Sequence, residues 1–193
     1  RPAPPPKRPH QYRPPPLDHA GLLATRYCAA HPPVPLAKMV AALNMDALPV
    51  RGPAKDFAVI GYGQSDLDAL LADVLKGQDR IAVPEPTPQN GFYFRSDHFN
   101  FARVGVPALY GRSGLDLRDG GVEAGAAEAA DYTAKRYHKT SDEFDPSWDL
   151  GGTVEDVQAL YQVARRIADS DLVPQWSADS EFRAAGEARM KAK

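Results

Sequence analysis

A chain of 193 residues is long enough for one domain with a hydrophobic core, and its 43% hydrophobic and 25% charged residues are ordinary for a globular protein. A formal net charge of −2 gives no electrostatic basis for binding nucleic acid or an anionic membrane, and no apolar run approaches the ~20 residues that span a bilayer. The single cysteine, Cys28, excludes an intrachain disulfide and a zinc site built on cysteines. We therefore expect neither a nucleic-acid partner nor a membrane partner.

The beginning of the chain differs in composition from the rest. Eight of the first sixteen residues are proline, and most of the others are basic or small. Because proline lacks a donor N–H and fixes φ, we predict that residues 1–17 form a disordered or polyproline II tail and that residues 18–193 form the folded domain. Two alternative interpretations are a ligand for a proline-binding domain and sequence that is not native to the gene product.

Strand-like and helix-like patterns of apolar residues alternate through the rest of the chain. They predict, in order, a helix over 18–30, strands over 40–48 and 57–62, a helix over 65–75, a short strand over 80–83, a helix capped by Ser96 or Asp97, a strand over 105–110, and helices over 153–167 and 180–193. Residues 117–131 are rich in Gly, Ala and charge without a clear period, so they are predicted to be a flexible surface loop. Strands alternating with helices favour an α/β fold with a mixed sheet flanked by helices.

Some predictions concern caps and buried faces. Ser65 and Thr153 are candidate N-caps of their helices, and Gly77 is expected to end the 65–75 helix. The apolar stripe of the 153–167 helix, which includes Leu160 and Tyr161, is expected to face the core. In the first helix, Leu22, Leu23, Tyr27 and Cys28 fall close to one face. The strand over 40–48 alternates little, as expected for a strand buried on both faces.

Two polar residues are candidate metal ligands. Asp46 interrupts an apolar run near the end of the predicted 40–48 strand, and an unpaired buried carboxylate costs several kcal/mol. His138 lies in a polar loop ahead of the 153–167 helix. In open α/β sheets, ligands bind outside the carboxyl ends of the strands, so the two side chains are expected to converge there. Considered alone, however, an aspartate after a strand is more often structural than a ligand.

Several short stretches, in their order and spacing, resemble the C-terminal part of the M28 family of zinc-dependent aminopeptidases. The resemblance covers residues from about 21 to 185. The stretches are Gly21-Leu22-Leu23, Asn44-Met45-Asp46, Arg95-Ser96-Asp97-His98-Phe99, Gly105-Val106-Pro107-Ala108-Leu109, Tyr137-His138 with Ser141-Asp142-Glu143, and Phe144-Asp145-Pro146-Ser147-Trp148-Asp149-Leu150. The fold that it implies is part of a zinc-peptidase domain of the phosphorylase/hydrolase-like kind.

The resemblance also implies a chemistry. Two zinc ions would polarise the peptide carbonyl and lower the pKa of a bridging water, with the free N-terminus of a peptide substrate held beside a metal. Asp46 would ligate one zinc ion and His138 the other. Ser96 and Asp97 match a motif near the site, and His98 is expected to be a hydrogen-bonded structural residue rather than a ligand. Full-length relatives are generally exported, so a periplasmic or secreted location is expected, whereas the oligomeric state is not implied.

The chain departs from the family pattern upstream of residue 21. The family's His-x-Asp motif and its bridging aspartate have no counterpart, and Asp18 and His19 replace two adjacent glutamates. Asp18 is the candidate general base, one methylene shorter than glutamate, and His19 is a candidate zinc ligand. We expect a truncated or misread gene product. Its function would be di-zinc hydrolysis of N-terminal peptide bonds; the alternative is an inactive remnant or a peptide-binding module of the same fold.

Overall fold

The computed structural model describes residues 5–11 and 21–191 of the chain. At its centre is a four-stranded sheet of order β1-β4-β2-β3, formed by β1 (Ala42–Asn44), β2 (Asp56–Val59), β3 (Ile81–Pro84) and β4 (Ala108–Ser113). β1 runs parallel to β4, β2 runs parallel to β3, and β2 runs antiparallel to β4. The predicted mixed sheet is confirmed.

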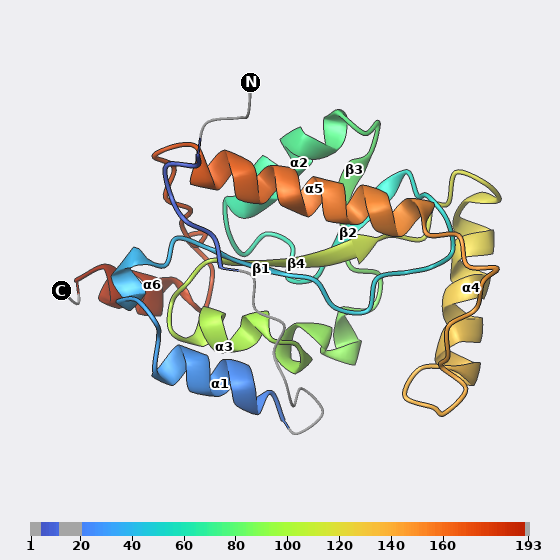
Figure 1. Ribbon diagram of the computed structural model, residues 1–193, viewed down its shortest axis with the longest axis horizontal. Helices are drawn as coiled ribbons and strands as arrows, with labels where there is room; N and C mark the ends of the chain where they lie inside the picture. The colour runs from blue at the N-terminus through green and yellow to red at the C-terminus, as the bar shows by residue number, and fades with distance from the viewer. Residues whose placement is uncertain (1–4, 12–20, 192–193) are drawn as a thin grey trace.

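Helices cover both faces of this sheet (Figure 1). On one face lie α2 (Leu67–Lys76) and α5 (Gly151–Ala168), and on the other lie α1 (Leu23–Ala30) and α3 (His98–Arg103). α4 (Gly121–Lys135) stands at one end of the molecule, and α6 (Arg183–Lys191) packs beside the short 3-10 helix η2 (Leu36–Lys38). Two further 3-10 turns, η3 (Pro88–Asn90) and η4 (Phe92–Arg95), precede α3. The flanking helices confirm the α/β class.

A hydrophobic cluster lies on each side of the sheet. Neighbouring residues of β4 serve opposite clusters, because side chains alternate along a strand: Leu109 packs with Phe57 and the α2–α5 layer, whereas Tyr110 packs with Tyr93 and Trp176. This alternation places the polar residues that follow β1 on the side of Tyr110 and α3, since Asn44 pairs with Tyr110 in register.

The predicted loop over residues 117–131 is wrong, because α4 occupies most of it. The stretch is alanine-rich and therefore has high intrinsic helix propensity. It shows no apolar period because α4 buries almost nothing; within the helix only Gly125 is buried, and a Cβ there would lie 2.0 Å from the Leu115 carbonyl oxygen. A helix without a buried face leaves no periodic signal in the sequence.

The strands are shorter than predicted. β1 covers only Ala42–Asn44 and is half-buried, not buried on both faces, because it is an edge strand of the sheet. β2 ends at Val59, and the chain turns at Gly61, whose φ of +83° favours glycine. The strand predicted from 105–110 is confirmed as β4, which continues to Ser113.

Several predicted caps and faces are also wrong. Tyr161 is 51% exposed whereas Leu160 is buried, so the stripe of α5 that faces the core is rotated from the predicted one. Thr153 lies inside α5, and its hydroxyl donates to the Pro49 carbonyl instead of capping the helix. In α1, Thr25 and Ala29 are buried. Of the residues predicted for its apolar face, Leu23 and Tyr27 are exposed, and Leu22 and Cys28 are only half-buried.

Other predictions hold, or lie beyond the described residues. α2 ends at Gly77 as predicted, and although the residue before the helix is Asp66, it is the Ser65 hydroxyl that accepts a hydrogen bond from the Leu67 amide, at 3.4 Å. The described part of the proline-rich segment contacts α5, because the Arg8 amide donates to the Ala168 carbonyl at 2.9 Å. The predicted boundary between residues 17 and 18 lies outside the described residues, as do the remaining parts of the predicted tail. No helix in residues 5–11 and 21–191 is long and apolar enough to cross a membrane.

Candidate metal and substrate site

Asp46 follows the C-terminal end of β1 by two residues and is exposed. Its Oδ2 accepts a hydrogen bond from the Ser96 hydroxyl at 2.5 Å, and its Oδ1 accepts one from the Ala47 amide at 2.8 Å. A carboxylate has about four acceptor positions. Each oxygen therefore keeps a lone pair while both are held in orientation, which leaves the group able to bind a cation.

A short chain of side chains supports this carboxylate from behind. The Asn44 amide donates to the Ser96 hydroxyl at 2.7 Å, and Ser96 is only 3% exposed at the start of α3. Ser96 was expected near the site from the sequence, whereas the role of Asn44 was missed. The available signal was its position two residues before Asp46, because residues i and i+2 of a strand share a face.

His98 is buried directly behind this group. It is 1% exposed, and its ring lies 4.6 Å from that of Tyr93 and 4.9 Å from that of Tyr110, between ring centroids. Within the described part of the chain neither ring nitrogen has a hydrogen-bond partner, so the expected hydrogen-bonded histidine is wrong in that respect. Burial lowers the pKa of His98 to about 3, against the opposing charge of Asp46. The imidazole is therefore neutral at physiological pH.

His138 lies in the loop after α4 and is exposed. Its ring stacks on that of Tyr137 with the centroids 4.0 Å apart. Its φ of 57° is in the left-handed region, which costs a residue other than glycine roughly 1–2 kcal/mol. Such strain is found where the surrounding structure fixes one orientation, as functional sites often do.

Tyr110 lies near Asp46. Burial is the largest cause that raises the pKa of Tyr110 to about 12, and the negative charge of Asp46 raises it further, with the smallest contribution from Tyr137. The predicted convergence of Asp46 with His138 stays a prediction, and Asp18 and His19 lie outside the described residues.

Asp46 and His138 offer an oxygen and a nitrogen donor, which suits zinc. A catalytic zinc ion takes three protein ligands, however. In the part of the chain that the structure describes, no group of three or more His, Cys, Asp or Glu side chains is placed to hold a metal ion. The described residues thus fit the donor chemistry of zinc but do not complete a catalytic site.

A cavity of about 440 Å³ lies against the segment that carries His138. Its lining includes Tyr132 and Arg136 of that segment, together with Arg51, Trp148 and Asp149. Arg112 lies on the Asp46 side: its guanidinium donates to the Ala47 carbonyl at 3.2 Å and lies 5.4 Å from the ring centre of Phe92. The cavity is lined by polar and aromatic side chains, and neither Asp46 nor His138 is among them.

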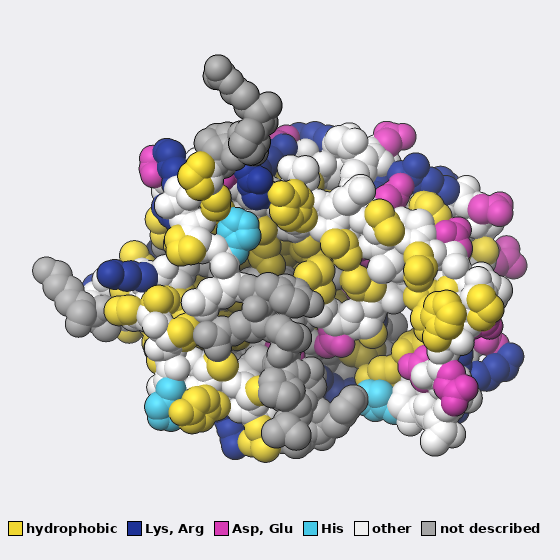
Figure 2. All heavy atoms as spheres, viewed as in Figure 1, with side chains coloured by type: hydrophobic (Ala, Val, Ile, Leu, Met, Phe, Trp, Pro, Cys, Tyr) yellow, Lys and Arg dark blue, Asp and Glu magenta, His cyan; other side chains and the backbone are white. Residues whose placement is uncertain are grey.

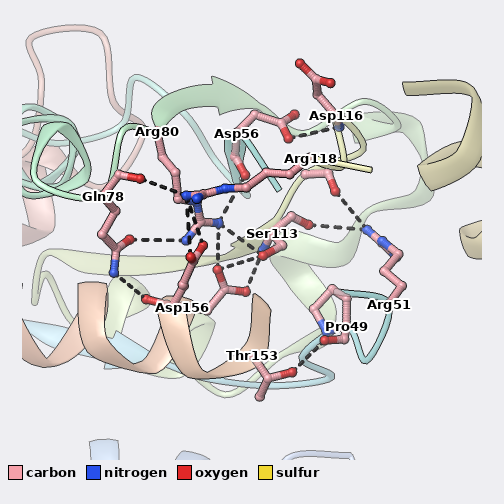
Figure 3. Close-up of polar contacts among 12 residues, drawn as sticks. Pro49, Arg51, Asp56, Gln78, Arg80, Ser113, Asp116, Arg118, Thr153 and Asp156 are labelled. Atoms are coloured by element: carbon pink, nitrogen blue, oxygen red, sulfur yellow. Dashed lines mark hydrogen bonds and ion pairs between the residues drawn. The ribbon is translucent and has the colours of Figure 1, made fainter. Parts of the chain in front are cut away.

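A second polar cluster, around Asp156, is buried away from solvent, whereas Asp46 is exposed (Figure 3). The Arg80 guanidinium and the Asp156 carboxylate are fully buried and 2.7 Å apart. Asp156 also accepts hydrogen bonds from the amide and the hydroxyl of Ser113, at 2.7 and 2.8 Å. From the sequence, Asp156 is only one residue within the predicted 153–167 helix. Its partners are Ser113 in β4 and Arg80 just before β3, so no local pattern identified it.

Comparison with known proteins adds one finding. The model of peptidase family M28 matches residues 18–162, well over half of the chain. No curated protein and no solved structure matches this chain. The matched range contains Asp46, Ser96 and His138, so the open polar site lies inside the family domain and not in an appended segment.

Proposed function

The chain belongs to peptidase family M28, and from this premise we propose that its site serves the metal-dependent removal of N-terminal residues from peptides. Membership of the family indicates a peptidase, which binds peptide substrates. The observation that carries the finer proposal is the Asp46 carboxylate, exposed at the end of β1 and held by Ser96 with acceptor capacity to spare. Two zinc ions are the cofactor that we propose for it.

Asp46 and His138 are the proposed ligands from the described part of the chain. Zinc bound there would act as a Lewis acid and would lower the pKa of a bound water. Ser96 and Asn44 fix the carboxylate, and Tyr137 fixes the imidazole by stacking on it. These contacts limit ligand motion, which raises metal affinity because less freedom is lost on binding.

His19 is the proposed third donor, and Asp18 is the proposed general base. Both positions fall within the range that matches the family, where the family pattern carries two adjacent glutamates. The start of α1 is attached to the segment that supports Asp46, because the Thr25 hydroxyl donates to the Asp97 carboxylate at 2.6 Å, next to Ser96.

A second candidate function is a peptide-binding module, or remnant, that lacks catalysis. The observation that favours it is the lack of a third donor beside any candidate pair in residues 5–11 and 21–191. Peptide binding needs only the cavity beside the His138 segment, lined in part by Arg51, Arg136 and Trp148, which does not depend on a complete metal centre.

Hydrolysis of leucine p-nitroanilide by purified protein, with and without added zinc, separates the two functions. The aminopeptidase proposal expects zinc-dependent release of nitroaniline that a chelator abolishes, and no release from the N-acetylated substrate, which lacks a free amine. His138→Ala should lose this activity. His31→Ala is the matched control, because His31 is also exposed and also stacks on a tyrosine. Folded protein without activity at saturating zinc would contradict the proposal and favour the binding module.

A further inference from the structure

The cavity beside the His138 segment is lined by charged side chains of both signs. Its volume of about 440 Å³ lies in the range of small-molecule sites, roughly 300–1,000 Å³. Its half-buried lining residues, apart from a valine, are two arginines and two aromatic residues: Arg51, Arg136, Tyr132 and Trp148. Its exposed lining residues, apart from a serine, are all acidic: Glu128, Asp131, Asp145 and Asp149. We call these two sets the floor and the rim of the cavity; in Figure 2, acidic side chains gather at the end of the molecule where α4 stands.

The two arginines of the floor lack a counter-ion in the part of the chain that the structure describes. Arg51 donates to two neutral acceptors, the carbonyl oxygens of Ser113 and Gly114, at 3.4 and 3.0 Å. Arg136 lies over the ring of Tyr132, 5.5 Å from its centre. None of the ion pairs formed within residues 5–11 and 21–191 includes either arginine. Both guanidinium groups therefore keep donor capacity for an anion.

The acids of the rim lie within electrostatic range of these arginines but do not pair with them. Burial lowers the pKa of Arg51, and the charge of Glu128 opposes that shift. Hydrogen bonds within its own loop lower the pKa of Asp145, and the charge of Arg136 lowers it further. Of the four acids, only Asp131 is in an ion pair among the described residues, with a lysine of α4. Opposite charges therefore line the cavity without neutralising one another.

The floor also holds two donors that lack an acceptor. The Nε atom of Arg51 and the Nε1 atom of Trp148 are buried and have no hydrogen-bond partner among the described residues. A buried donor without a partner is uncommon and destabilising, so these two N–H groups favour an acceptor such as a carboxylate on this side of the cavity. A ligand with a carboxylate alone, however, would be repelled by the four acids of the rim. The ligand that fits both sets therefore carries a positive group as well.

We propose that the cavity binds a free α-amino acid, with its carboxylate toward the two arginines of the floor and its ammonium group toward Glu128 and Asp145 of the rim. A zwitterion of this kind supplies each set with the opposite charge and brings no net charge of its own. The faces of the two aromatic rings also attract the ammonium group. So small a ligand makes few contacts, and we expect a Kd on the order of 0.1 mM.

This ligand differs from the peptide considered above for the same cavity, and the inference does not rest on hydrolysis. Neither Asp46 nor His138 lines the cavity. Amino-acid binding in the absence of zinc and zinc-dependent release of nitroaniline can therefore each fail without the other. A chain that hydrolyses leucine p-nitroanilide but binds no amino acid would contradict only the inference made here.

The two tryptophans of the chain give a direct test by nuclear magnetic resonance of isotope-labelled protein. Leucine serves as the probe, because the two recognised groups are common to all α-amino acids. Titration with leucine to about 10 mM, without zinc, should move the indole N–H resonance of Trp148, assigned with Trp148→Phe, in a saturable way. The Trp176 resonance is the internal control and should stay in place, because its N–H already donates to the Gly105 carbonyl at 3.0 Å in the core. A Trp148 resonance that does not move, or two resonances that move equally, overturns the proposal.

Related compounds test which groups of the ligand are recognised. Leucinamide lacks the carboxylate and N-acetylleucine lacks the ammonium group, and each should bind about ten-fold or more weakly than leucine. Equal affinity for leucine and N-acetylleucine would show a site for anions, and tighter binding of leucyl-leucine than of leucine would show a site for peptides. Either result overturns the proposal.

Substitutions in the rim and the floor test the orientation of the ligand. Glu128→Gln should weaken leucine binding by about three-fold to ten-fold yet strengthen N-acetylleucine binding, because it removes a negative charge from the rim. Glu123→Gln is the matched control, since Glu123 is also an exposed acid of α4 but does not line the cavity. Arg136→Gln should weaken both ligands, and its control is Arg103→Gln, because Arg103 also lies over an aromatic ring, 5.8 Å from its centre, outside the cavity. Glu128→Gln that changes the affinity for both ligands in the same direction, or for neither, overturns the proposal.

Discussion

Two carboxylates show how differently this molecule uses the same side chain. Asp156 is fully buried, and its oxygens accept three hydrogen bonds, one from Arg80 and two from Ser113. Asp46 is exposed and accepts two, one on each oxygen. A carboxylate that is buried and paired with a guanidinium inside the core holds the fold together. One that is oriented but incompletely used keeps the capacity to bind a cation.

The largest expected effect is on the closed cluster. Asp156→Ala leaves the Arg80 guanidinium buried without its counter-charge, and breaking a buried pair in this way costs about 3–5 kcal/mol. Urea denaturation should show this loss in the free energy of unfolding. Asp169→Ala is the control, because the Asp169–Arg165 pair lies at the surface. Equal losses in the two variants would contradict the contrast between closed and open carboxylates.

Asp46→Ala should instead change the stability little and the zinc affinity strongly. Because the side chain is exposed, we expect the free energy of unfolding to change by less than about 1 kcal/mol. Zinc affinity, measured by competition with a chromogenic chelator, should fall by about 100-fold or more, since a ligand and not a supporting group is removed. A variant that unfolds easily but binds zinc as the native chain does would show that Asp46 is structural.

Ser96→Ala tests the support of the open carboxylate. It removes the hydroxyl that donates to Asp46 and accepts from Asn44, so the carboxylate gains freedom. Zinc affinity should fall by roughly 10–100-fold, less than in Asp46→Ala. Ser96→Thr keeps the hydroxyl and should retain most of the affinity, provided that the added methyl group fits at this buried position. Native affinity in Ser96→Ala would show that the hydrogen bond does not position the ligand.

A third carboxylate, that of Asp68, is half-buried and so lies between Asp156 and Asp46 in exposure. Its replacement should have the smallest effect on stability. It accepts one hydrogen bond, from the Gly63 amide at 2.6 Å, and burial raises its pKa to about 6. Because the folded-state pKa lies above the ordinary value of 3.8, the protonated carboxyl stabilises the fold below pH 3.8. This contribution is lost as the pH rises through about 6.

Asp68→Asn should therefore remove a decline in stability between about pH 4 and 6. Urea denaturation at several pH values across this window measures the decline in both proteins. Curves with the same pH dependence would show that Asp68 is solvated like Asp46 and is not an intermediate case.

The sequence predicted elements best where a helix or strand buries a face. The pattern of α2, with Leu67, Leu71 and Leu75 in the core, gave its position and its end at Gly77. The pattern failed for α4, which buries almost nothing and is helical through alanine propensity. It also failed for the orientation of α5, because that helix has two apolar stripes and only tertiary packing selects which of them faces the sheet.

For the candidate site, the sequence predicted Asp46 and His138 as ligands and Ser96 as a neighbour. It did not predict the position of Ser96 behind the carboxylate, which depends on β1 and α3 packing side by side. It also did not predict that His98 would lie between two tyrosine rings without a hydrogen bond in the described part of the chain. A contact between segments some fifty residues apart, such as that of Asp46 with Ser96, leaves no repeating pattern in the sequence from which it could be predicted.

By itself, the sequence determined the family, the α/β class and the order of most helices and strands, because turn residues, propensities and short motifs act locally. Only the tertiary structure decided which carboxylate is buried against a counter-charge and which is open at the surface. Burial and hydrogen bonding of a side chain depend on what the rest of the chain places against it: Arg80 and Ser113 meet Asp156 in the core, whereas the Asp46 carboxylate remains at the surface.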